Sequence, residues 1–499
     1  MSLDLTSTLA ALPPLPTEAS GYRTQVKTAL DVQRSKATTA SSAIPLLVAL
    51  DDDPTGTQTC HDVSVLTVWD VPTLVDQFVR SNTKASSYYG FFILTNSRAL
   101  HPEPARALIQ DICRNLQRAS EITGRPFEVV LRGDSTLRGH FPLEPEAVES
   151  VLGAADAWVL CPFFLQGGRY TIGDVHYVAD TETNKLVPAA ETPFAKDATF
   201  GYKSSNLREY AVEKGKGAIL PEDVTSISID TIRVGGVPAI YEQLRNLPTG
   251  KRTVVAINAA AEEDVDAVVL ALMQAASQAG KKFLFRTGAA FVSARLGIVP
   301  IDPLPFSALH APDPTPDTPT PGGLVIAGSY VPKTTAQLSV LTCKSGDRLS
   351  TVVLSVNELL STPESANAAV ASAIATAERD IARGQDVLVM TSRDLVVGAD
   401  EAASLDIGAT VARALVDFLT SLSVKPRYVI AKGGITSSDM ATKALRFRRA
   451  LVVGQAAPGV PLWRCDEPTS KWPGLPYVVF PGNVGSNETL FDVVDKWRA

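Results

Sequence analysis

Short apolar runs alternate with segments of helical periodicity along most of this chain. Residues 44–50, 89–95 and 127–131 are runs of this kind, and polar residues follow each of them directly. Strands that alternate with helices favour a parallel sheet, because a parallel connection needs a crossover long enough to hold a helix. We therefore predict an α/β fold with two domains, each a mainly parallel sheet flanked by helices, and a ligand cleft between them.

A proline-rich segment divides the chain, with eight prolines between Pro300 and Pro321. Proline at this density blocks both helix and central strand, because it lacks a backbone donor and has a fixed φ. Such a segment is typical of a semi-extended linker. The predicted organisation is an N-terminal tail at 1–42 with a helix over 21–34, a first domain at 43–300, a linker at 301–322 and a second domain at 323–499.

The apolar runs and the helical periodicity give a list of expected elements. Strands are expected at 44–50, 63–69, 89–95, 127–131, 157–162, 225–229, 253–258, 282–285, 323–327, 351–356, 386–391, 427–431 and 477–480. Helices are expected at 71–81, 101–122, 238–247, 261–280, 364–382, 406–422, 436–447 and 486–497. Residues 191–218 read as a polar insertion.

Composition excludes several classes of protein. The net charge of −7 and the lack of a basic block argue against nucleic acid as a partner, and no apolar run approaches membrane-spanning length. The five cysteines are scattered singly with no CxxC pair, so neither a disulfide framework nor a zinc site is indicated. A reducing compartment, the cytoplasm, fits best, and the N-terminus has no apolar core of a signal peptide.

Polar groups gather at four strand ends of the first half. These are Asp51-Asp52-Asp53, Asn96-Ser97-Arg98, Arg132-Gly133-Asp134-Ser135 and Arg286-Thr287-Gly288. In a parallel sheet these ends meet at one edge, where ligands bind. Carboxylates suit hydroxyl groups, and guanidiniums suit a carboxylate or a phosphate. A small polyhydroxy acid would satisfy both sets; the alternative is that Arg98, Arg132 and Arg138 only pair with nearby acids.

The segment at 131–140 (LRGDSTLRGH) holds several charged and polar side chains. Asp134 lies between Arg132 and Arg138 in sequence, so its carboxylate is expected to stay ionised. An ionised carboxylate suits a group that orients a hydroxyl or accepts its proton. His140 and His176 are weaker candidates, since a lone histidine is more often a satisfied polar residue.

Two glycine-rich junctions in the second half predict a nucleotide cleft. Residues 432–438 (KGGITSS) and 481–486 (PGNVGS) each run from a strand into a helix, and Gly328-Ser329-Tyr330 offers a third wall. Glycine-rich backbone at a helix start presents free N–H groups to phosphate. Lys333 stands where a P-loop needs its second glycine, and GxGxxG is absent, so neither a P-loop nor a dinucleotide fold is supported.

Six segments in this order resemble the four-carbon acid sugar kinase family: DDDPTGTQT, LTNSR, LRGDSTLRGH, GSY, AKGGITSSD and PGNVG. That family includes 3-oxo-tetronate, threonate and erythronate kinases, and the resemblance covers the chain from about Ile44 to its C-terminus. It implies a sugar-acid-binding domain at 43–300 and a nucleotide-binding domain at 323–499. It also implies phosphorylation of a hydroxyl of a small sugar acid by ATP with Mg²⁺.

The resemblance places site residues on this sequence. Substrate contacts are expected from Asp52, Asp53, Thr55, Gly56, Arg98, Arg132, Asp134, Ser135 and Arg138. ATP contacts are expected from Ser329, Gly433, Gly434, Ile435, Thr436, Gly482, Asn483 and Gly485. Asp53 or Asp134 would orient or deprotonate the attacking hydroxyl, and no metal ligand is assigned. The third acid Asp51, Pro54 after the acid pair, the long tail and the proline linker depart from the family pattern.

Other functions stay open. A non-catalytic sensor of sugar acids would keep the cleft without turnover. A Schiff-base aldolase would need a buried lysine at a strand end, for which Lys432 is the candidate. A dehydrogenase is disfavoured by the missing dinucleotide motif. The expected partner is a small-molecule sugar acid, with no nucleic acid and no membrane, and a homodimer is kept as one option for assembly.

Overall fold

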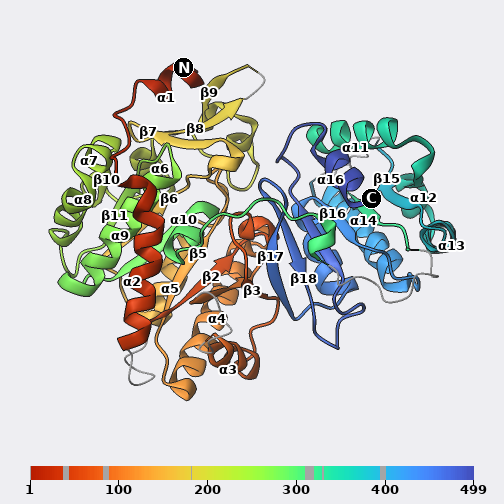
Figure 1. Cartoon of the computed structure of the whole chain (residues 1–499), viewed down its shortest axis with the longest axis horizontal. Helices are drawn as coiled ribbons and strands as arrows, with labels where there is room; N and C mark the ends of the chain where they lie inside the picture. Colours follow the sequence, from red (N-terminus) through yellow and green to blue (C-terminus); the bar gives the residue numbers. More distant parts are fainter. Residues whose placement is uncertain are drawn as a thin grey trace. The chain divides into compact units, whose positions relative to one another are not determined.

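The computed structural model describes residues 2–36, 44–81, 89–180, 183–309, 320–328, 331–393 and 401–498. The chain divides into two compact units, Met1–Pro300 and Ile301–Ala499 (Figure 1). Each unit is α/β, with a mostly parallel sheet flanked by helices, which confirms the predicted fold class. Over the described residues, none of the helices is both long and apolar enough to span a membrane.

The sheet of unit 1 is parallel throughout its described strands. In spatial order these strands are β10 (Val224–Ile227), β11 (Thr253–Ile257), β6 (Ala157–Cys161), β12 (Phe283–Thr287), β5 (Phe127–Arg132), β2 (Leu46–Asp51), β4 (Gly90–Leu94) and β3 (Val63–Leu66). Every residue of β2 is buried, because helices cover both faces of a parallel sheet. This burial explains why the central strands are continuous apolar runs in the sequence.

Helices flank this sheet and pack on one another in pairs, such as α3 on α4 and α8 on α9. The helices of unit 1 after its N-terminal segment are α3 (Val71–Arg80), α4 (Pro102–Thr123), α5 (Leu143–Leu152), α6 (Leu207–Gly215), α7 (Ile229–Arg233), α8 (Gly236–Arg245), α9 (Glu262–Ala279) and α10 (Ala289–Arg295). The core joins Leu46, Val48 and Leu50 of β2 to Ile109 and Ile112 of α4. The unit therefore has its own hydrophobic core.

A second, antiparallel sheet of unit 1 was not predicted. Its strands are β1 (Leu3–Asp4), β9 (Lys185–Pro188), β8 (Val175–Asp180) and β7 (Arg169–Ile172), in this spatial order. These strands are short and do not form apolar runs, so the sequence pattern does not separate them from loops. The predicted polar insertion at 191–218 likewise contains the helix α6, which Asn206 caps by accepting from the backbone N–H of Arg208 at 3.0 Å.

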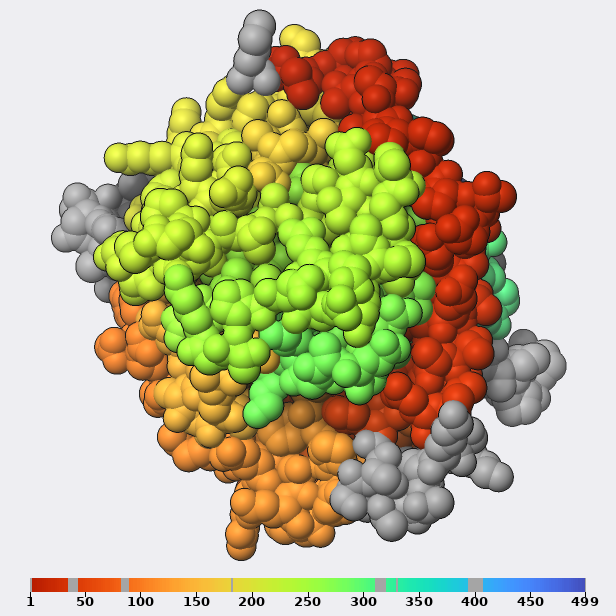
Figure 2. Space-filling model, turned by 90° about the vertical axis from the view of Figure 1, so that its left-hand side faces the viewer, coloured from red at the N-terminus to blue at the C-terminus, as the bar shows by residue number. Residues whose placement is uncertain are grey.

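The N-terminal segment belongs to unit 1 and is not a free tail over its described residues. It contains α1 (Leu5–Ala10) and α2 (Tyr22–Lys36), and α2 packs on α9. Arg23 is the reason for this docking: its guanidinium donates to Asp266 at 2.5 Å and to the carbonyl of Ile298 at 2.7 Å. Figure 2 shows the segment, in red, lying against the green elements. The predicted helix at 21–34 is present.

The sheet of unit 2 is parallel except at one edge, over the described strands. In spatial order these are β17 (Arg449–Ala457), β18 (Val460–Arg464), β19 (Pro476–Phe480), β16 (Val429–Lys432), β13 (Leu324–Ala327), β15 (Asp386–Thr391) and β14 (Leu349–Leu354). The hairpin β17–β18 is antiparallel and was not predicted. The other five strands match predicted runs.

Four described helices of unit 2 match predicted helices with shifted ends, whereas those at Pro332–Ser345 and Val356–Ser361 were not predicted. The described helices are α11 (Pro332–Ser345), α12 (Val356–Ser361), α13 (Pro363–Ala382), α14 (Glu401–Ser421), α15 (Gly434–Asp439), a π-helical turn at Met440–Ala444 and α16 (Thr489–Arg498). Part of the predicted linker packs on this unit: Phe306 contacts the rings of Tyr428 and Trp497. Residues 310–319, which hold four of the linker prolines, lie outside the described residues.

Candidate functional site

Four neighbouring strand ends of unit 1 come together, as their sequence predicts. Asp51, the last residue of β2, pairs with Leu94 of β4 and with Arg132 of β5, and Arg132 pairs with Thr287 of β12. Backbone bonds continue past the strands, from Gly133 N to Thr287 O at 2.9 Å. The polar residues that follow β2, β4, β5 and β12 therefore meet at one edge of the sheet.

Asp51 and Arg132 form a buried ion pair at the base of this edge. Arg132 Nη1 donates to Asp51 Oδ1 at 3.1 Å, and the two side chains are 4% and 1% exposed. Burial raises the pKa of Asp51 to about 7, although Arg132 opposes the rise. A Cβ at Gly56 would overlap the Asp51 carboxylate, so only glycine fits there. Asp51 thus supports the site from a buried position beneath the more exposed acids.

Asp53 and Arg98 form a second pair that is more exposed. Asp53 caps the 3-10 turn at Pro54–Thr57 by accepting from Thr55 N at 2.9 Å, and Arg98 donates to its other oxygen. Burial alone would raise the pKa of Asp53, but Arg98 and Arg132 outweigh it and hold the pKa below its usual value. Arg98 also lies 3.8 Å from Asp52. The Asp53 carboxylate is therefore ionised at neutral pH.

Asp134 is held by its own loop. Its carboxylate accepts from the hydroxyl of Thr136 and from Arg138 Nε, the latter at 2.6 Å, and it lies 3.7 Å from Arg98 Nη1. Burial would raise the pKa of Asp134, but Arg138 and Arg98 overcome that effect and hold it well below its usual range. Ser135 contributes its carbonyl, which accepts from His176 Nε2 at 2.7 Å. The predicted ionised state of Asp134 agrees with these contacts.

Two glycines shape the loop around Arg286. A Cβ at Gly133 would overlap the Arg286 guanidinium, and one at Gly139 would lie 2.5 Å from its Nη2. Arg286 donates to the carbonyl of Arg138 at 3.2 Å and lies 3.7 Å from Asp52 Oδ2. Both Asp52 oxygens are buried without a hydrogen-bond partner, though guanidiniums surround them. Asp52 is thus the least satisfied acid of the cluster.

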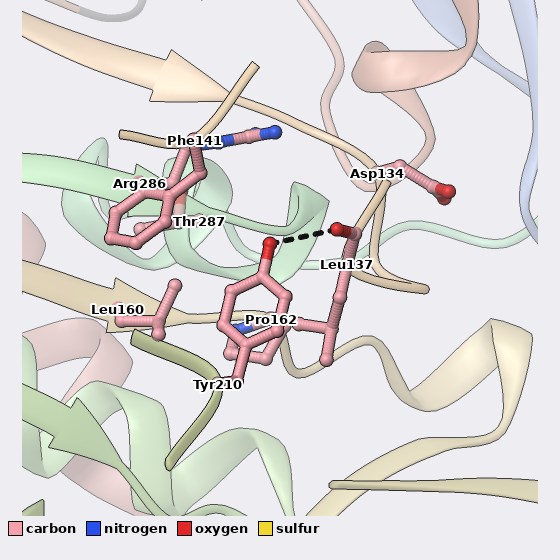
Figure 3. Close-up of a pocket in the computed structure, with 8 residues that line it drawn as sticks. All are labelled: Asp134, Leu137, Phe141, Leu160, Pro162, Tyr210, Arg286 and Thr287. Carbon is pink, nitrogen blue, oxygen red and sulfur yellow. Dashed lines mark hydrogen bonds between the residues drawn. The ribbon is translucent and has the colours of Figure 1, made fainter. Parts of the chain in front are cut away.

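A small cavity adjoins this loop (Figure 3). It has a volume of about 10 Å³, enough for one water molecule, and its lining residues are Asp134, Leu137, Phe141, Leu160, Pro162, Tyr210, Arg286 and Thr287. The hydroxyl of Tyr210 donates to the carbonyl of Leu137 at 2.9 Å, and the Asp134 carboxylate points away from the apolar wall. Thr287 Oγ1 is buried without a partner. A single water bound to Thr287 would satisfy it.

The two candidate histidines are satisfied polar residues. His140 Nε2 lies 3.1 Å from the carbonyl of Ser97 and 3.0 Å from that of Leu100. His176 lies between Ser135 and Thr171, 3.0 Å from the Thr171 hydroxyl, and burial lowers its pKa to about 4. Both rings stabilise the loops beside the acids, His176 through both ring nitrogens and His140 through Nε2.

Sequence reasoning missed Arg169 and Glu144. Arg169 is the first residue of the unpredicted strand β7 and is 6% exposed. Glu144 is 2% exposed, accepts from Ser97 Oγ at 2.5 Å, and burial raises its pKa to about 7. The Gly167-Gly168-Arg169 turn after β6 is the signal that could have pointed to Arg169.

The predicted nucleotide contacts of unit 2 lie on adjacent strand ends. Lys432 of β16 pairs with Ala327 of β13 and with Phe480 of β19. Gly433 has φ of +104°, which favours glycine, and its N–H donates to the carbonyl of Phe480 at 2.8 Å. Thr436 follows in α15, where its hydroxyl lies 3.3 Å from a Cβ built at Gly328. Three strand ends therefore face a common edge here as well.

The turn after β19 completes this edge. Gly482 has open space where a Cβ would stand, Asn483 is exposed, and Gly485 has φ of +81°. Gln337 of α11 anchors the turn by donating to the carbonyls of Val484 and Ser486 at 3.1 and 2.8 Å. Gly434 begins α15, and Ile435 is 68% exposed. Ser329 lies outside the described residues.

Lys432 is buried between the two turns. It is 0% exposed, donates to the carbonyl of Pro481 at 2.5 Å and lies 4.4 Å from the Phe480 ring centre. Burial, and to a lesser extent Lys333, lowers its pKa to about 7. Over the described residues it has no carboxylate partner, and Thr334 Oγ1 of α11 is buried without a hydrogen-bond partner. The charge of Lys432, which lacks a carboxylate partner, and the unpartnered hydroxyl of Thr334 fit an anionic ligand such as a polyphosphate.

A magnesium site built from protein side chains alone is not found among the described residues. They contain no group of three or more His, Cys, Asp or Glu side chains placed to bind a metal. In unit 1, Asp52, Asp53 and Asp134 already face guanidiniums, which supply the positive charge that a cation would bring.

Comparison with known proteins assigns each unit a ligand class. Residues 47–295 match the family described as the sugar-binding N-terminal domain, and residues 324–490 match the nucleotide-binding C-terminal domain. The chain is similar to a D-erythronate kinase from Heliobacterium modesticaldum, with 25% identity over 252 residues, which are 50% of this chain and 49% of that kinase. The alignment thus spans about half the length of this relative.

Two solved structures share the fold. A protein from Salmonella typhimurium LT2, described as a tRNA synthase, superposes with a TM-score of 0.64 at 16% identity, covering 90% of this chain and 98% of that one. The Haemophilus influenzae protein HI1011 has a TM-score of 0.57 at 18% identity, covering 90% of this chain and 99% of that one. At these identities the likeness shows the fold alone.

Proposed function

The chain belongs to the four-carbon acid sugar kinase family, and from that premise we propose that it transfers the terminal phosphoryl group of ATP to a hydroxyl of a small, four-carbon sugar acid. The observation that carries this proposal is the match of one chain to both a sugar-binding and a nucleotide-binding domain. The buried carboxylates and guanidiniums at the strand ends of unit 1 support it, since they suit the hydroxyls and the carboxylate of such a substrate.

The acceptor hydroxyl would bind Asp53 or Asp134. Their side chains are 13% and 11% exposed, whereas Asp51 and Asp52 are at most 3% exposed. Both accessible carboxylates have lowered pKa values, so each would accept a hydrogen bond from the hydroxyl at neutral pH. Phosphoryl transfer depends mostly on positioning and on charge stabilisation. A carboxylate that aligns the hydroxyl therefore suits this reaction even as a weak base.

Arg98 would hold these two carboxylates in place. It lies within ion-pair distance of Asp53 and Asp134, so one guanidinium fixes the spacing of both candidate hydroxyl acceptors. Thr55 and Gly56 shape the turn that carries Asp53, and Arg132 neutralises the buried Asp51. Thr55, Gly56 and Arg132 are thus proposed to support Asp51 and Asp53. Ser135 and Arg138 are proposed to support Asp134.

The nucleotide would bind the turns that follow β16 and β19 in unit 2. Backbone N–H groups of Gly434 and Gly482 would meet phosphate oxygens, with the ammonium of Lys432 close by. The N–H of Gly433 is engaged by the carbonyl of Phe480, so the proposed part of Gly433 is to shape the turn. When bound to ATP, Mg²⁺ neutralises phosphate charge and is held largely by phosphate oxygens and water. The ligand cleft between the two domains remains a prediction.

ADP formation tests the proposal. The full chain is incubated with Mg²⁺-ATP and a panel of D-erythronate, L-erythronate, D-threonate, L-threonate and 3-oxo-tetronate. We expect ADP to form with at least one acid and in amounts equal to the phosphorylated product. Tight binding of an acid without ADP from any member of the panel would instead identify a sensor. Turnover of an acid without ATP would favour the aldolase or dehydrogenase.

A further inference from the structure

Arg169 has a buried guanidinium with no acceptor among the described residues. The residue is 6% exposed, its Nε is buried without a hydrogen-bond partner, and no ion pair joins it to a described carboxylate. Leaving a charged group buried and unpaired is costly, more so than for a neutral polar group. The side chain therefore has unused capacity to bind an anion.

Arg138 lies near Arg169 but is already paired, with Asp134 at 2.6 Å and with Asp197 at 3.9 Å. Both guanidiniums stack over the ring of Phe194, with Cζ 5.2 Å from the ring centre for Arg138 and 5.6 Å for Arg169. Burial, and the nearby Arg138, lower the pKa of Arg169 to about 10, while Asp134 opposes the shift. Asp134 is already engaged by Arg138 and Thr136. Of these two guanidiniums, that of Arg169 is therefore the one with unused capacity for an anion.

The local fold holds Arg169 in this position. Phe164 and Arg169 exchange backbone hydrogen bonds of 3.2 and 2.9 Å, which closes a tight turn, and Gly168 in that turn has φ of +71°. A Cβ at Gly167 would overlap the Phe164 ring and would lie 3.3 Å from Arg169 Nη1, so glycine there leaves room for both side chains. The arginine is thus preorganised, which lowers the entropic cost of binding.

The other arginines of the site are already neutralised. Arg132 pairs with Asp51, and Arg98 pairs with Asp53 and lies near Asp134. Arg286 donates to a carbonyl and faces Asp52. The expectation that Arg98 or Arg132 binds the substrate carboxylate is therefore weaker than the alternative, in which they organise the acids.

We propose that Arg169, with Arg138 beside it, binds the carboxylate of the sugar acid and so selects acids over neutral polyols. The planar fork of a guanidinium matches a carboxylate with two parallel hydrogen bonds. Arg138 also donates to Asp134. It therefore connects the proposed carboxylate site to a candidate acceptor for the substrate hydroxyl. This inference deepens the proposed function and rests on it for the identity of the ligand.

Calorimetry without nucleotide tests the site. The full chain is titrated with each sugar acid of the panel, and the tightest is compared with erythritol or threitol, its neutral counterpart. Arg169→Gln should weaken binding of the acid by about 10- to 100-fold, the range for a lost charged hydrogen bond. Binding of the neutral polyol should not change, because it has no carboxylate to lose.

Two further variants separate recognition from folding. Arg169→Lys keeps the charge without the fork and should restore part of the affinity. Arg245→Gln removes an arginine that also stacks on a ring, that of Tyr241, but lies on the exposed surface of α8 and should leave both affinities unchanged. Each variant is melted to confirm that it folds.

Several outcomes overturn the proposal. These are unchanged acid binding in Arg169→Gln, a parallel loss of acid and polyol binding, or no binding of any acid by the wild type. A lower kcat with unchanged acid affinity would assign Arg169 to the transferred phosphoryl group instead. If acid binding depends on Arg169 but no acid yields ADP, the kinase proposal fails while this site stands.

Discussion

Two kinds of carboxylate occupy the strand ends of unit 1. Asp53 and Asp134 are partly exposed and have lowered pKa values, because guanidiniums contact them directly. Asp51 is fully buried, and its pKa rises to about 7. Charge state and accessibility thus separate acids that look equivalent in the sequence. The accessible ionised pair is the one suited to a hydroxyl ligand.

Neutralising the accessible acids should slow the reaction. Asp53→Asn and Asp134→Asn should each lower kcat by about 10²- to 10⁴-fold, the range for a lost proton-accepting group, with ATP affinity unchanged. Asp51→Asn is the control, since Asp51 is buried and keeps an acceptor for Arg132 as asparagine; its kcat should stay within about tenfold of wild type. Steady-state ADP release measures all three. Full activity in both Asp53→Asn and Asp134→Asn would refute the assignment.

Lys432 should make ATP affinity depend on pH. Its pKa of about 7 in the free protein means that the ammonium form falls as pH rises above 7. Phosphate binds the charged form and raises the pKa, so ATP binding should take up a proton near pH 8 and weaken as pH increases further. Calorimetry in two buffers of different ionisation enthalpy measures this uptake.

Lys432→Met should abolish that proton uptake. Lys425→Met is the matched control, because Lys425 also donates to a proline carbonyl, that of Pro473 at 3.1 Å, but lies on the exposed surface. ATP binding by the Lys425→Met variant should take up as many protons as ATP binding by the wild type. Equal uptake in Lys432→Met and wild type would exclude Lys432 as the coupled group.

At the scale of elements, burial decides what the sequence predicts. The parallel strands are buried on both faces, so their apolar runs and polar ends identify both the strands and the edge where Asp51 and Arg132 meet. The strands β7, β8 and β9 hold polar residues such as Arg169, Thr171 and His176 at buried positions, so their pattern is not distinctive. Arg169 was missed with β7. Whether an arginine is already paired with an acid depends on distances between residues of different strands. A local sequence pattern does not contain these distances.

The N-terminal helix α2 should contribute strongly to stability. Arg23→Met would leave Asp266 buried without its partner, which costs about 3–5 kcal/mol in unfolding free energy. Adding Asp266→Leu should recover part of this loss. Lys27→Met removes an exposed pair with Asp31 on the same helix and should cost at most about 0.5 kcal/mol. Urea unfolding measures each; equal effects of Arg23→Met and Lys27→Met would contradict the docking role.

At the scale of the whole molecule, each unit has its own core. One core includes Leu50 and Ile112 in unit 1, and the other includes Val325 and Trp497 in unit 2. The sequence predicted two α/β domains, and the proline-rich segment marks the change from one to the other. A homodimer and a cytoplasmic location remain predictions from the sequence.

Separate cores predict two thermal transitions with separate ligands. A ligand raises the midpoint of the unit that binds it by mass action. A sugar acid from the panel should shift one transition in scanning calorimetry, and ATP should shift the other. The Arg169→Gln variant should lose only the shift caused by the acid. A single transition that moves with either ligand would show instead that the units unfold together.

The short sheet β7–β9 has a consequence for how members of this family diversify. It sits between β6 and α6 in sequence and supplies Arg169, whereas the parallel strand ends supply the hydroxyl-binding acids. If Arg169 binds the substrate carboxylate as proposed, the residues that select the substrate and those that bind its acceptor hydroxyl lie in different stretches of the chain. Grafting this sheet and its turns from one relative to another should therefore exchange acid preference while the reaction itself is retained.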